Sequence, residues 1–342
     1  MRIALDATYS VGENLSGVGL YSERMLLGLA SAHPEADFLL CYRPHRFLRS
    51  LARKLPANCS RRLMFETYAP RSAALFHGLN QRLPQVRFRR AVTTFHDLFV
   101  LTGDYSSAEF RRRFADLARH AAHRSDLIIA VSEFTAAQVR DLLGVERSRV
   151  RVVPHGVLPA AAPDLPRDKL ILHVGAIQKR KNIVRLVEAF EQVEAGWRLA
   201  LAGSLGYGGE EILGRIAESP RKADIQVLGY VSRERLAELY ARASVFAFPS
   251  LDEGFGMPVL EAMAAGLPVL TSNRPALAEV SGEAALLVDP ADGAAIAAAL
   301  GRLTTDDALR RDLIGRGLKR AAGFTWERAV DKTWTVYREL LA

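Results

Sequence analysis

Residues 249–268 read PSLDEGFGMPVLEAMAAGLP, and this stretch decides how the C-terminal half of the chain folds. It follows the apolar run Val245–Phe248, which we predict to be a strand. Gly254 and Gly256 allow the backbone to approach a ligand closely and to adopt positive φ angles. Pro258 suits the first turn of a helix. A helix that begins after glycines presents free amides, and phosphate is their usual ligand.

Two glutamates border this expected anion site. Glu253 lies in the loop, and Glu261 lies one turn into the helix. Carboxylates beside a phosphate would repel it unless they bind hydroxyl groups on either side of it. A sugar on one side and a ribose on the other meet that need. The alternative interpretation is a strand-to-helix turn whose glutamate interacts with the helix dipole.

The filled pattern EGFGMPVLEAMAAGLPV, with seven residues between Glu253 and Glu261, resembles the signature of retaining glycosyltransferases of family 4, which have the GT-B fold. The resemblance implies two Rossmann-like doubly wound α/β domains that face a cleft. It also implies a C-terminal helix that crosses back to the N-terminal domain. Within the family, a variant with the sequence R-K-N, here residues 180–182, resembles the polysaccharide and O-antigen mannosyltransferase branch.

The length of 342 residues favours two domains over one. We predict an N-terminal domain at residues 1–158, completed by a C-terminal helix at 325–342, and a C-terminal domain at 167–324. Residues 154–166 (PHGVLPAAAPDLP) are rich in proline and alanine and are expected to be the linker.

Short apolar strands alternate with helical stretches, which is typical of parallel α/β sheets. The strands expected are Ile3–Asp6, Phe38–Cys41, Ala91–Phe95, Leu127–Val131, Val150–Val153, Leu170–Val174, Leu199–Ala202, Val227–Leu228, Val245–Phe248 and Pro268–Thr271. The last helix has aromatic residues at helical spacing, which we interpret as a core face.

The net charge of +8 is confined to the N-terminal half. Residues 1–158 carry 23 Lys and Arg against 14 Asp and Glu, and the remainder is nearly balanced. Such a surface favours an anionic membrane or a lipid phosphate, or is a solvated basic face. No nucleic-acid reader motif accompanies the charge, so nucleic acid is not expected as a partner.

Cellular location follows from composition. No run of 18 apolar residues is present, and the N-terminal ten residues include Asp6, so neither a spanning helix nor a signal peptide is expected. Two cysteines are too few for a disulfide framework. We expect a cytoplasmic protein, located at the inner face of the membrane if the basic half binds lipid.

The N-terminal half contains candidate residues in three places: after the first strand, at the end of a later strand and in the linker region. Gly17 and Gly19 open a helix after the first strand and could place backbone amides against a phosphate. Ser22 stands where a dinucleotide fingerprint has its third glycine, so this is weak support for NAD. His96 ends a strand at the expected lip of the cleft. The resemblance implies that His96 lies near the transferred sugar, and His155 in the linker region could touch the cleft.

Three cations, Lys179–Lys181, stand at the start of a helix, where they oppose the helix dipole and call for a compensating anion. A diphosphate has enough negative charge. The family has a lysine here and commonly an arginine directly after the glycine, where this chain has Ala176. We therefore assign charge stabilisation of the leaving diphosphate to Lys181 and Arg180, and include His96 and Glu253 among the catalytic candidates.

The donor itself is expected to contact residues that the resemblance places along the same edge of the C-terminal domain. These are Gly203, Ser204, Gly229, Tyr230, Gly254, Phe255, Gly256, Met257, Val259, Leu260 and Glu261, together with Gly17 and Gly19. The nucleobase would meet backbone near residues 227–231, so uracil and guanine both stay open.

The sequence contains no D-x-D pair, so no metal site and no cofactor are expected. The resulting hypothesis is a retaining transferase that moves a sugar from a GDP- or UDP-sugar, with GDP-mannose favoured, to a glycan or lipid-linked acceptor. Three alternatives remain: an NAD-dependent oxidoreductase, a pyridoxal phosphate-dependent phosphorylase of the same fold, and a subunit that binds nucleotide-sugar without catalysis.

Overall fold

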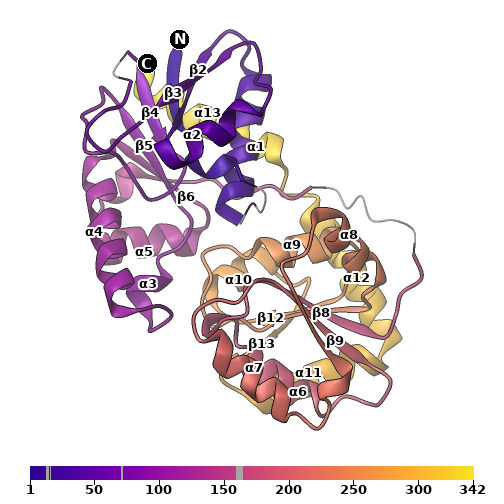
Figure 1. Cartoon of the computed structure of the whole chain (residues 1–342). Coiled ribbons are helices and arrows are strands. Elements are labelled where there is room, and N and C mark those ends of the chain that lie inside the picture. The colour runs from indigo at the N-terminus through magenta and orange to yellow at the C-terminus, as the bar shows by residue number, and fades with distance from the viewer. Residues whose placement is uncertain (13–14, 16, 71, 159–164) are drawn as a thin grey trace. The chain divides into compact units, whose positions relative to one another are not determined.

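The computed structural model describes residues 1–12, 15, 17–70, 72–158 and 165–342. Part of the glycine-containing stretch at 14–21, and residues 159–164 of the expected linker, therefore lie outside the described residues. The chain forms two compact units (Figure 1). Unit 1 contains residues 1–102, 108–156 and 325–342, and unit 2 contains residues 103–107 and 157–324.

Unit 1 is a seven-stranded parallel sheet with helices on its two faces. Its strands are β1 (Arg2–Asp6), β2 (Asp37–Tyr42), β3 (Cys59–Leu63), β4 (Leu75–Gly78), β5 (Ala91–Phe95), β6 (Leu127–Ala130) and β7 (Val150–Val152). Its helices are η1 (Thr8–Ser10), α1 (Gly17–Ala32), α2 (Pro44–Leu51), α3 (Phe99–Thr102), α4 (Ala108–Arg124), α5 (Glu133–Leu143), η2 (Arg147–Arg149) and α13 (Trp326–Leu341).

Unit 2 is a six-stranded parallel sheet built in the same way. Its strands are β8 (Leu170–Val174), β9 (Arg198–Ala202), β10 (Ile225–Gly229), β11 (Val245–Phe248), β12 (Val269–Ser272) and β13 (Leu286–Val288). Its helices are η3 (Lys179–Lys181), α6 (Ile183–Phe190), α7 (Gly209–Glu218), η4 (Lys222–Asp224), α8 (Arg233–Arg242), α9 (Met257–Ala264), α10 (Pro275–Ser281), α11 (Gly293–Thr305) and α12 (Asp307–Ala321).

The strand order of both sheets is that of a doubly wound fold. Unit 1 has the order β3-β2-β1-β4-β5-β6-β7, and unit 2 has β10-β9-β8-β11-β12-β13. In each sheet the order reverses beside the first strand, between β1 and β4 and between β8 and β11. Ligands of such folds bind beyond the carboxyl ends of the strands at that reversal point. The predicted α/β class with two Rossmann-like domains is confirmed.

Three strands were missing from the sequence prediction: β3, β4 and β13. β3 reads CSRRL and is the edge strand of its sheet. An edge strand is less buried than a central strand, so it can contain polar residues. β4 reads LFHG and contains a buried histidine, and β13 has three residues. Polar or very short strands lack the apolar run by which a buried parallel strand is identified.

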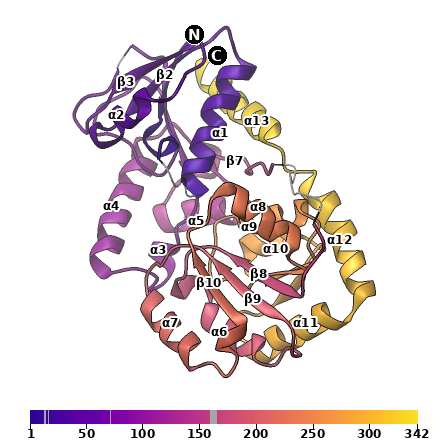
Figure 2. The ribbon, with the colours of Figure 1, turned by 45° about the vertical axis from the view of Figure 1, so that its right-hand side comes forward.

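Helix α13 packs along α1 within unit 1 (Figure 2). Trp326, Val330 and Tyr337 are buried there, as predicted for a core face. The Tyr337 hydroxyl lies 2.5 Å from His77 Nδ1 on β4, and His77 Nε2 lies 2.8 Å from Thr94 Oγ1 on β5. This buried chain of hydrogen bonds joins the last helix of the sequence to the centre of the first sheet.

The α1–α13 contact depends on a glycine. A Cβ added to Gly28 would lie 2.5 Å from Val330 Cγ2, so the two helices pack closely only because Gly28 has no side chain. Elsewhere in a helix, alanine is more favourable than glycine by up to about 1 kcal/mol.

We therefore predict that Gly28→Ala changes the free energy of unfolding in opposite directions in two backgrounds. In the wild type it should lower the free energy of unfolding of unit 1 by about 1–3 kcal/mol, because of the overlap with Val330. In a Val330→Ala background it should raise it by about 0.5–1 kcal/mol. Denaturant titration measures both values. Gly214→Ala on α7, with nothing within 4 Å of the added Cβ, is the control and should stabilise in either background.

Candidate functional site

Glycines bring three loops of unit 2 together at the carboxyl ends of β8, β9 and β10. Gly203 has φ +158°, and a Cβ there would lie 1.9 Å from the carbonyl oxygen of Gly175. The Gly175 amide donates to Ala202 O at 2.9 Å, and the Gly203 amide donates to Gly229 O at 2.8 Å. Gly203 and Gly229, both predicted to line the donor site, therefore fix the spacing of the loops.

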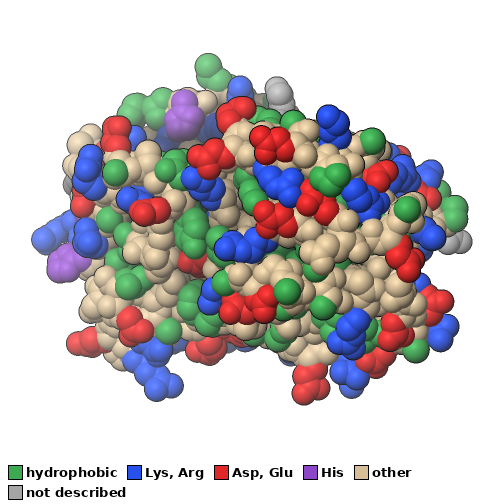
Figure 3. Space-filling model, turned by 90° about the horizontal axis from the view of Figure 1, so that it is seen from below, with side chains coloured by type: hydrophobic (Ala, Val, Ile, Leu, Met, Phe, Trp, Pro, Cys, Tyr) green, Lys and Arg blue, Asp and Glu red, His purple; other side chains and the backbone are tan. Residues whose placement is uncertain are grey.

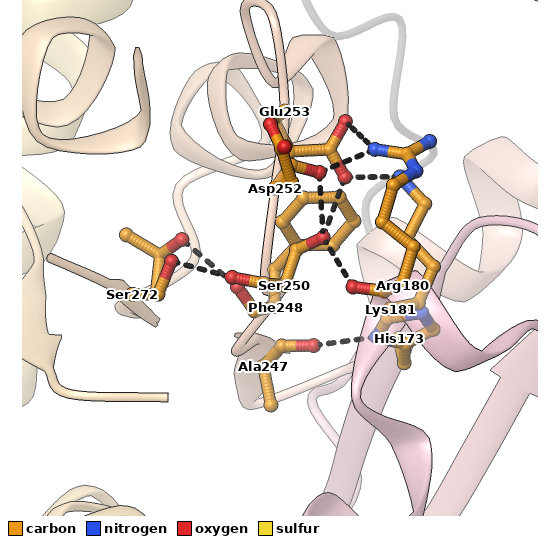
Figure 4. Close-up of polar contacts among 10 residues, drawn as sticks. His173, Arg180, Lys181, Ala247, Phe248, Ser250, Asp252, Glu253 and Ser272 are labelled. Carbon is orange, nitrogen blue, oxygen red and sulfur yellow. Dashed lines mark hydrogen bonds and ion pairs between the residues drawn. The ribbon is translucent and has the colours of Figure 1, made fainter. Parts of the chain in front are cut away.

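A cluster of four side chains, Arg180, Lys181, Ser250 and Glu253, occupies the reversal point between β8 and β11; we call it the Glu253 cluster (Figure 4). Glu253 Oε2 lies 2.8 Å from Arg180 Nη1. Glu253 Oε1 accepts hydrogen bonds from Lys181 Nζ and from Ser250 Oγ, the latter at 2.7 Å. Each of the three charged residues is less than 10% exposed. The sequence predicted these residues for one site, and the structure brings them together.

The anion that compensates the two cations in this structure is Glu253 itself. Burial alone would raise the pKa of Glu253, but Arg180 and Lys181 outweigh it and hold the pKa at about 2. Lys181 Nζ also lies 4.6 Å from the centre of the Phe248 ring, a cation–π distance. The cluster therefore contains two buried cations for one carboxylate.

The residue after the cations, Asn182, shapes the loop and was not among the predicted residues. It has φ +58°, a left-handed conformation that asparagine tolerates better than most residues. Its side-chain amide donates to Pro249 O at 3.1 Å and to Pro290 O at 2.7 Å. Asn182 therefore ties the loop after β8 to the loop after β11.

His173, on β8 below the cluster, is fully buried. Its Nδ1 lies 2.9 Å from Ala247 O, which can only accept, so Nδ1 carries the proton. Nε2 is buried without a hydrogen-bond partner among the described residues. Burial lowers the pKa of His173 to about 4, so the imidazole is neutral at physiological pH and adds no charge to the site.

Helix α9 begins as the sequence predicted. Gly256 precedes it with φ +97°, and the described residues provide no side-chain cap at this helix start. The Val259 amide already donates to Gly256 O at 3.0 Å, and the side chains of Phe255, Val259 and Leu260 are buried. The predicted contacts of Phe255, Val259 and Leu260 with the donor stay predictions, and the amides at the start of α9 are the candidate donors for an anion.

Glu261, one turn into α9, is half-buried and is positioned by a residue that sequence reasoning did not include. Tyr240, from α8, donates its hydroxyl hydrogen bond to Glu261 Oε2 at 2.9 Å. Burial raises the pKa of Glu261, and the Tyr240 hydrogen bond opposes that shift. Tyr240 lies 21 residues away in sequence, and no local pattern links the two.

Ser204 and Tyr230 lie beside these loops. Ser204 provides the carbonyl that accepts from the Ile177 amide at 2.9 Å, and Tyr230 is 48% exposed directly after Gly229. Gly254 lies in the turn between Glu253 and the start of α9. Their predicted contacts with the donor stay predictions.

In unit 1, His96 and His155 form a stacked pair with ring centres 5.2 Å apart. His96 Nε2 lies 2.9 Å from Leu79 O and therefore carries its proton, so Nδ1 accepts from His155 Nε2 at 3.3 Å. Burial lowers the pKa of His96 to about 4, despite the opposing contact with Leu79. Because both nitrogens of His96 are engaged, the predicted bond to a sugar hydroxyl would have to replace one of these partners.

Gly17 is the first residue of α1, and Gly19 has a packing role. A Cβ at Gly19 would lie 2.9 Å from Tyr9 O, so the glycine lets α1 approach η1. The packing of α1 against η1 therefore explains Gly19, and no ligand is needed to account for it.

The described residues lack two further kinds of site. No group of three or more His, Cys, Asp or Glu side chains is arranged to hold a metal ion. In that same part of the chain, none of the helices combines the length and apolar character that crossing a bilayer requires.

The paired doubly wound sheets and the cation cluster at a reversal point define the class as a glycosyltransferase of the GT-B fold. The model for "Glycosyl transferases group 1" matches residues 161–320, and that for "Glycosyltransferase Family 4" matches residues 34–160. The chain therefore belongs to the family 4 and group 1 glycosyltransferases.

Relatives agree with this assignment. The O-antigen chain mannosyltransferase B of Escherichia coli is 31% identical, over 98% of this chain and 99% of its own length. Sucrose-phosphate synthase from Thermosynechococcus elongatus superimposes with a TM-score of 0.81 at 24% identity, covering 100% of this chain and 99% of that one. Anabaena HepE, solved with UDP and glucose, superimposes with a TM-score of 0.74 at 16% identity, covering 98% and 99%. The oxidoreductase alternative is set aside by the family matches.

We predict that Glu253→Gln destabilises unit 2, because it leaves two buried cations without their carboxylate; breaking a buried pair costs about 3 kcal/mol or more. The pKa of about 2 lies below the usual Glu value, so the charged form stabilises the fold above pH 4.5 and loses that effect as pH falls toward 2.

The difference in unfolding free energy between wild type and Glu253→Gln should therefore shrink between pH 5 and pH 3 in denaturant titrations. The control is Glu211→Gln, which removes an exposed partner of Lys179 and should cost under about 1 kcal/mol. A difference that does not vary with pH would show that Glu253 is not held ionised by the two cations.

Proposed function

We propose that this glycosyltransferase moves mannose from GDP-mannose, with retention of anomeric configuration and without a metal, to a glycan or lipid-linked acceptor. The observation that carries the donor assignment is the Glu253 cluster: two buried cations at a doubly wound reversal point, beside an uncapped helix start. Mannose is supported by the 31% identical O-antigen mannosyltransferase. A UDP-sugar is the second candidate, since HepE was solved with UDP.

In this proposal the diphosphate lies against Lys181, Arg180 and the amides of Gly256 and Met257, which stabilise charge on the leaving group. Glu261 accepts hydrogen bonds from the ribose, oriented by Tyr240. Glu253 accepts one from a sugar hydroxyl once the diphosphate shares its cations.

The ionic contacts of Glu253 also support front-face transfer over a covalent intermediate. A carboxylate with a pKa of about 2, both of whose oxygens already contact cations, is a weak base and a weak nucleophile. The acceptor proton would instead pass to the leaving phosphate oxygen. A glycosidase-like pair of carboxylates is then not required.

The unit 1 sheet, with His96 at the end of β5, would bind the acceptor.

The decisive test is a donor screen with steady-state kinetics. We expect GDP-mannose to raise the melting temperature and to be consumed with an acceptor mannoside, more efficiently than UDP-glucose, UDP-GlcNAc or dTDP-rhamnose. Lys181→Ala should lower kcat about 100-fold, because the leaving group loses a cation. Glu261→Ala should raise the donor KM about tenfold, because ribose hydrogen bonds are lost.

The same assay contains its controls. Lys179→Ala removes the exposed neighbouring cation and should leave both constants nearly unchanged. EDTA should not reduce the rate, and the anomeric proton of the product should keep the donor configuration. Unchanged kinetics in both Lys181→Ala and Glu261→Ala would remove the donor-site assignment.

We also propose peripheral membrane association through the basic N-terminal half, at the cytoplasmic face. The excess of positive charge in residues 1–158 supports this proposal. The face shown in Figure 3 carries Lys and Arg interspersed with Asp and Glu, so that face is not a uniformly basic surface. Helix α2 adds apolar surface, with Leu48 76% and Leu51 55% exposed beside Arg49.

Vesicle co-sedimentation tests the membrane proposal. Binding to vesicles with 30% anionic lipid should fall several-fold between 50 and 300 mM salt, because exposed charges are screened. Leu48→Ser should weaken it further, because the exposed leucine no longer inserts. Equal binding to zwitterionic vesicles would contradict an electrostatic mode.

A further inference from the structure

Unit 1 contains a second ionic cluster, separate from the residues discussed above. Arg43, Glu66 and Arg82 form it, and we call it the Arg43–Glu66–Arg82 triad. Both guanidinium groups donate to a single oxygen, Glu66 Oε1, Arg82 Nη2 at 2.7 Å. No other acidic side chain among the described residues forms a salt bridge with either arginine, so one carboxylate serves two cations.

The donors of these arginines are not all used. Arg43 is 94% buried, and its Nε and Nη2 have no hydrogen-bond partner among the described residues. Arg82 Nε also has no hydrogen-bond partner among the described residues. Buried donors without acceptors are costly, and a guanidinium normally pairs with oxygens through several of its N–H groups. The single Glu66 oxygen therefore satisfies only some of the arginine donors, and a larger anion could satisfy more of them.

The triad lies where a ligand of this fold would bind. Arg43 directly follows β2, Glu66 follows β3 and Arg82 follows β4; β2 and β4 are the two neighbours of β1 in the sheet. The Arg43 amide donates to Thr8 Oγ1 at 3.2 Å, just beyond the end of β1. Carboxyl ends of parallel strands near the reversal point are the binding edge of doubly wound domains.

Exposed aromatic side chains accompany the charges. Phe65 is 43% exposed and Tyr68 61% exposed, one on each side of Glu66 in a turn closed by the Phe65 amide and Tyr68 O at 2.7 Å. Tyr9, which is 39% exposed, lies beside Arg82. Aromatic faces pack against sugar rings, and paired arginines bind phosphate oxygens.

We propose that the Arg43–Glu66–Arg82 triad is an anion site for a phosphate or diphosphate group carried by the glycan acceptor, with Glu66 as an internal anion that the phosphate displaces. Glu66 is suited to leave, because its side chain is 38% exposed while that of Arg43 is 8% exposed. A phosphate has three oxygens with which to fill the donors that one carboxylate oxygen leaves unused. The assignment of this ligand to the acceptor rests on the proposed function; the anion site itself does not.

The first experiment measures the anion site without any transfer reaction. Inorganic pyrophosphate is titrated calorimetrically into a Lys181→Ala background, in which the cation cluster of unit 2 is weakened. Arg82→Gln should weaken binding about tenfold, since a charge-assisted hydrogen bond is lost. Glu66→Gln should tighten it about tenfold, since the competing anion is gone. Circular dichroism verifies that each variant is folded.

The matched control is Arg49→Gln, on the exposed face of nearby α2, which changes the net charge as Arg82→Gln does. It should change pyrophosphate affinity less than twofold. Arg82→Lys keeps the charge but loses the fork of donors, and should be intermediate. If Arg82→Gln equals Arg49→Gln, or if Glu66→Gln fails to tighten binding, the triad is a structural ion cluster and the proposal is wrong.

The second experiment identifies the source of the anion. Transfer is compared between octyl α-mannoside, the same glycan on a lipid diphosphate, and octyl α-mannoside with added inorganic phosphate. We expect Arg82→Gln to raise KM about tenfold for the lipid diphosphate alone, with unchanged donor KM. An equal effect on the neutral mannoside would overturn the acceptor assignment, and inhibition by free phosphate alone would assign the site to a free ion. Loss of all transfer in the wild type would contradict the proposed function while leaving the calorimetric result standing.

Discussion

Unit 2 depends on one interaction, the contact of the Glu253 carboxylate with two buried cations. Lys181 and Arg180 follow β8, Glu253 follows β11, and these strands are neighbours only because the strand order reverses between them. Without Glu253 the two buried cations would lose their carboxylate partner, and breaking a buried ion pair in this way is strongly destabilising. The loops, the glycine contacts and the Asn182 hydrogen bonds hold this one pairing in place.

The same pairing explains how two buried cations are tolerated side by side. One internal carboxylate contacts both cations. A ligand with more negative charge and more oxygens than a carboxylate can then take over the cations. The triad in unit 1 has the same ratio of two cations to one carboxylate, although it occurs in a different loop environment. Both clusters follow the carboxyl ends of strands, which is the edge where doubly wound domains bind their ligands.

Much of the fold followed from local chemistry. The strands at Ala91–Phe95, Leu170–Val174 and Val245–Phe248 lie where the apolar runs predicted, and α9 begins after Gly256 because glycine and proline chemistry is local. Strands β3 and β4 are not predicted from the sequence, because β3 is a polar edge strand and β4 contains a buried histidine. Neither strand therefore has a continuous apolar run. The site residues Glu253, Lys181 and Arg180 are predicted together from the sequence, whereas Tyr240 and Asn182 are not, since their partners lie many residues away. Ser250 is not predicted either, although its partner Glu253 is only three residues away.

The sequence by itself determined the two-domain α/β class, the glycine-bounded helix start, and the presence of three cations and two acids beside it, one acid in the loop and one in the helix. It could do so because periodicity and turn chemistry act over a few residues. Tertiary structure decided which of these charges meet. Glu253 reaches Lys181 across 72 residues, and His96 engages both of its nitrogens with Leu79 and His155. Such pairings arise where parallel strands place their carboxyl ends side by side, and that adjacency is a property of strand order in the sheet, which no local pattern contains.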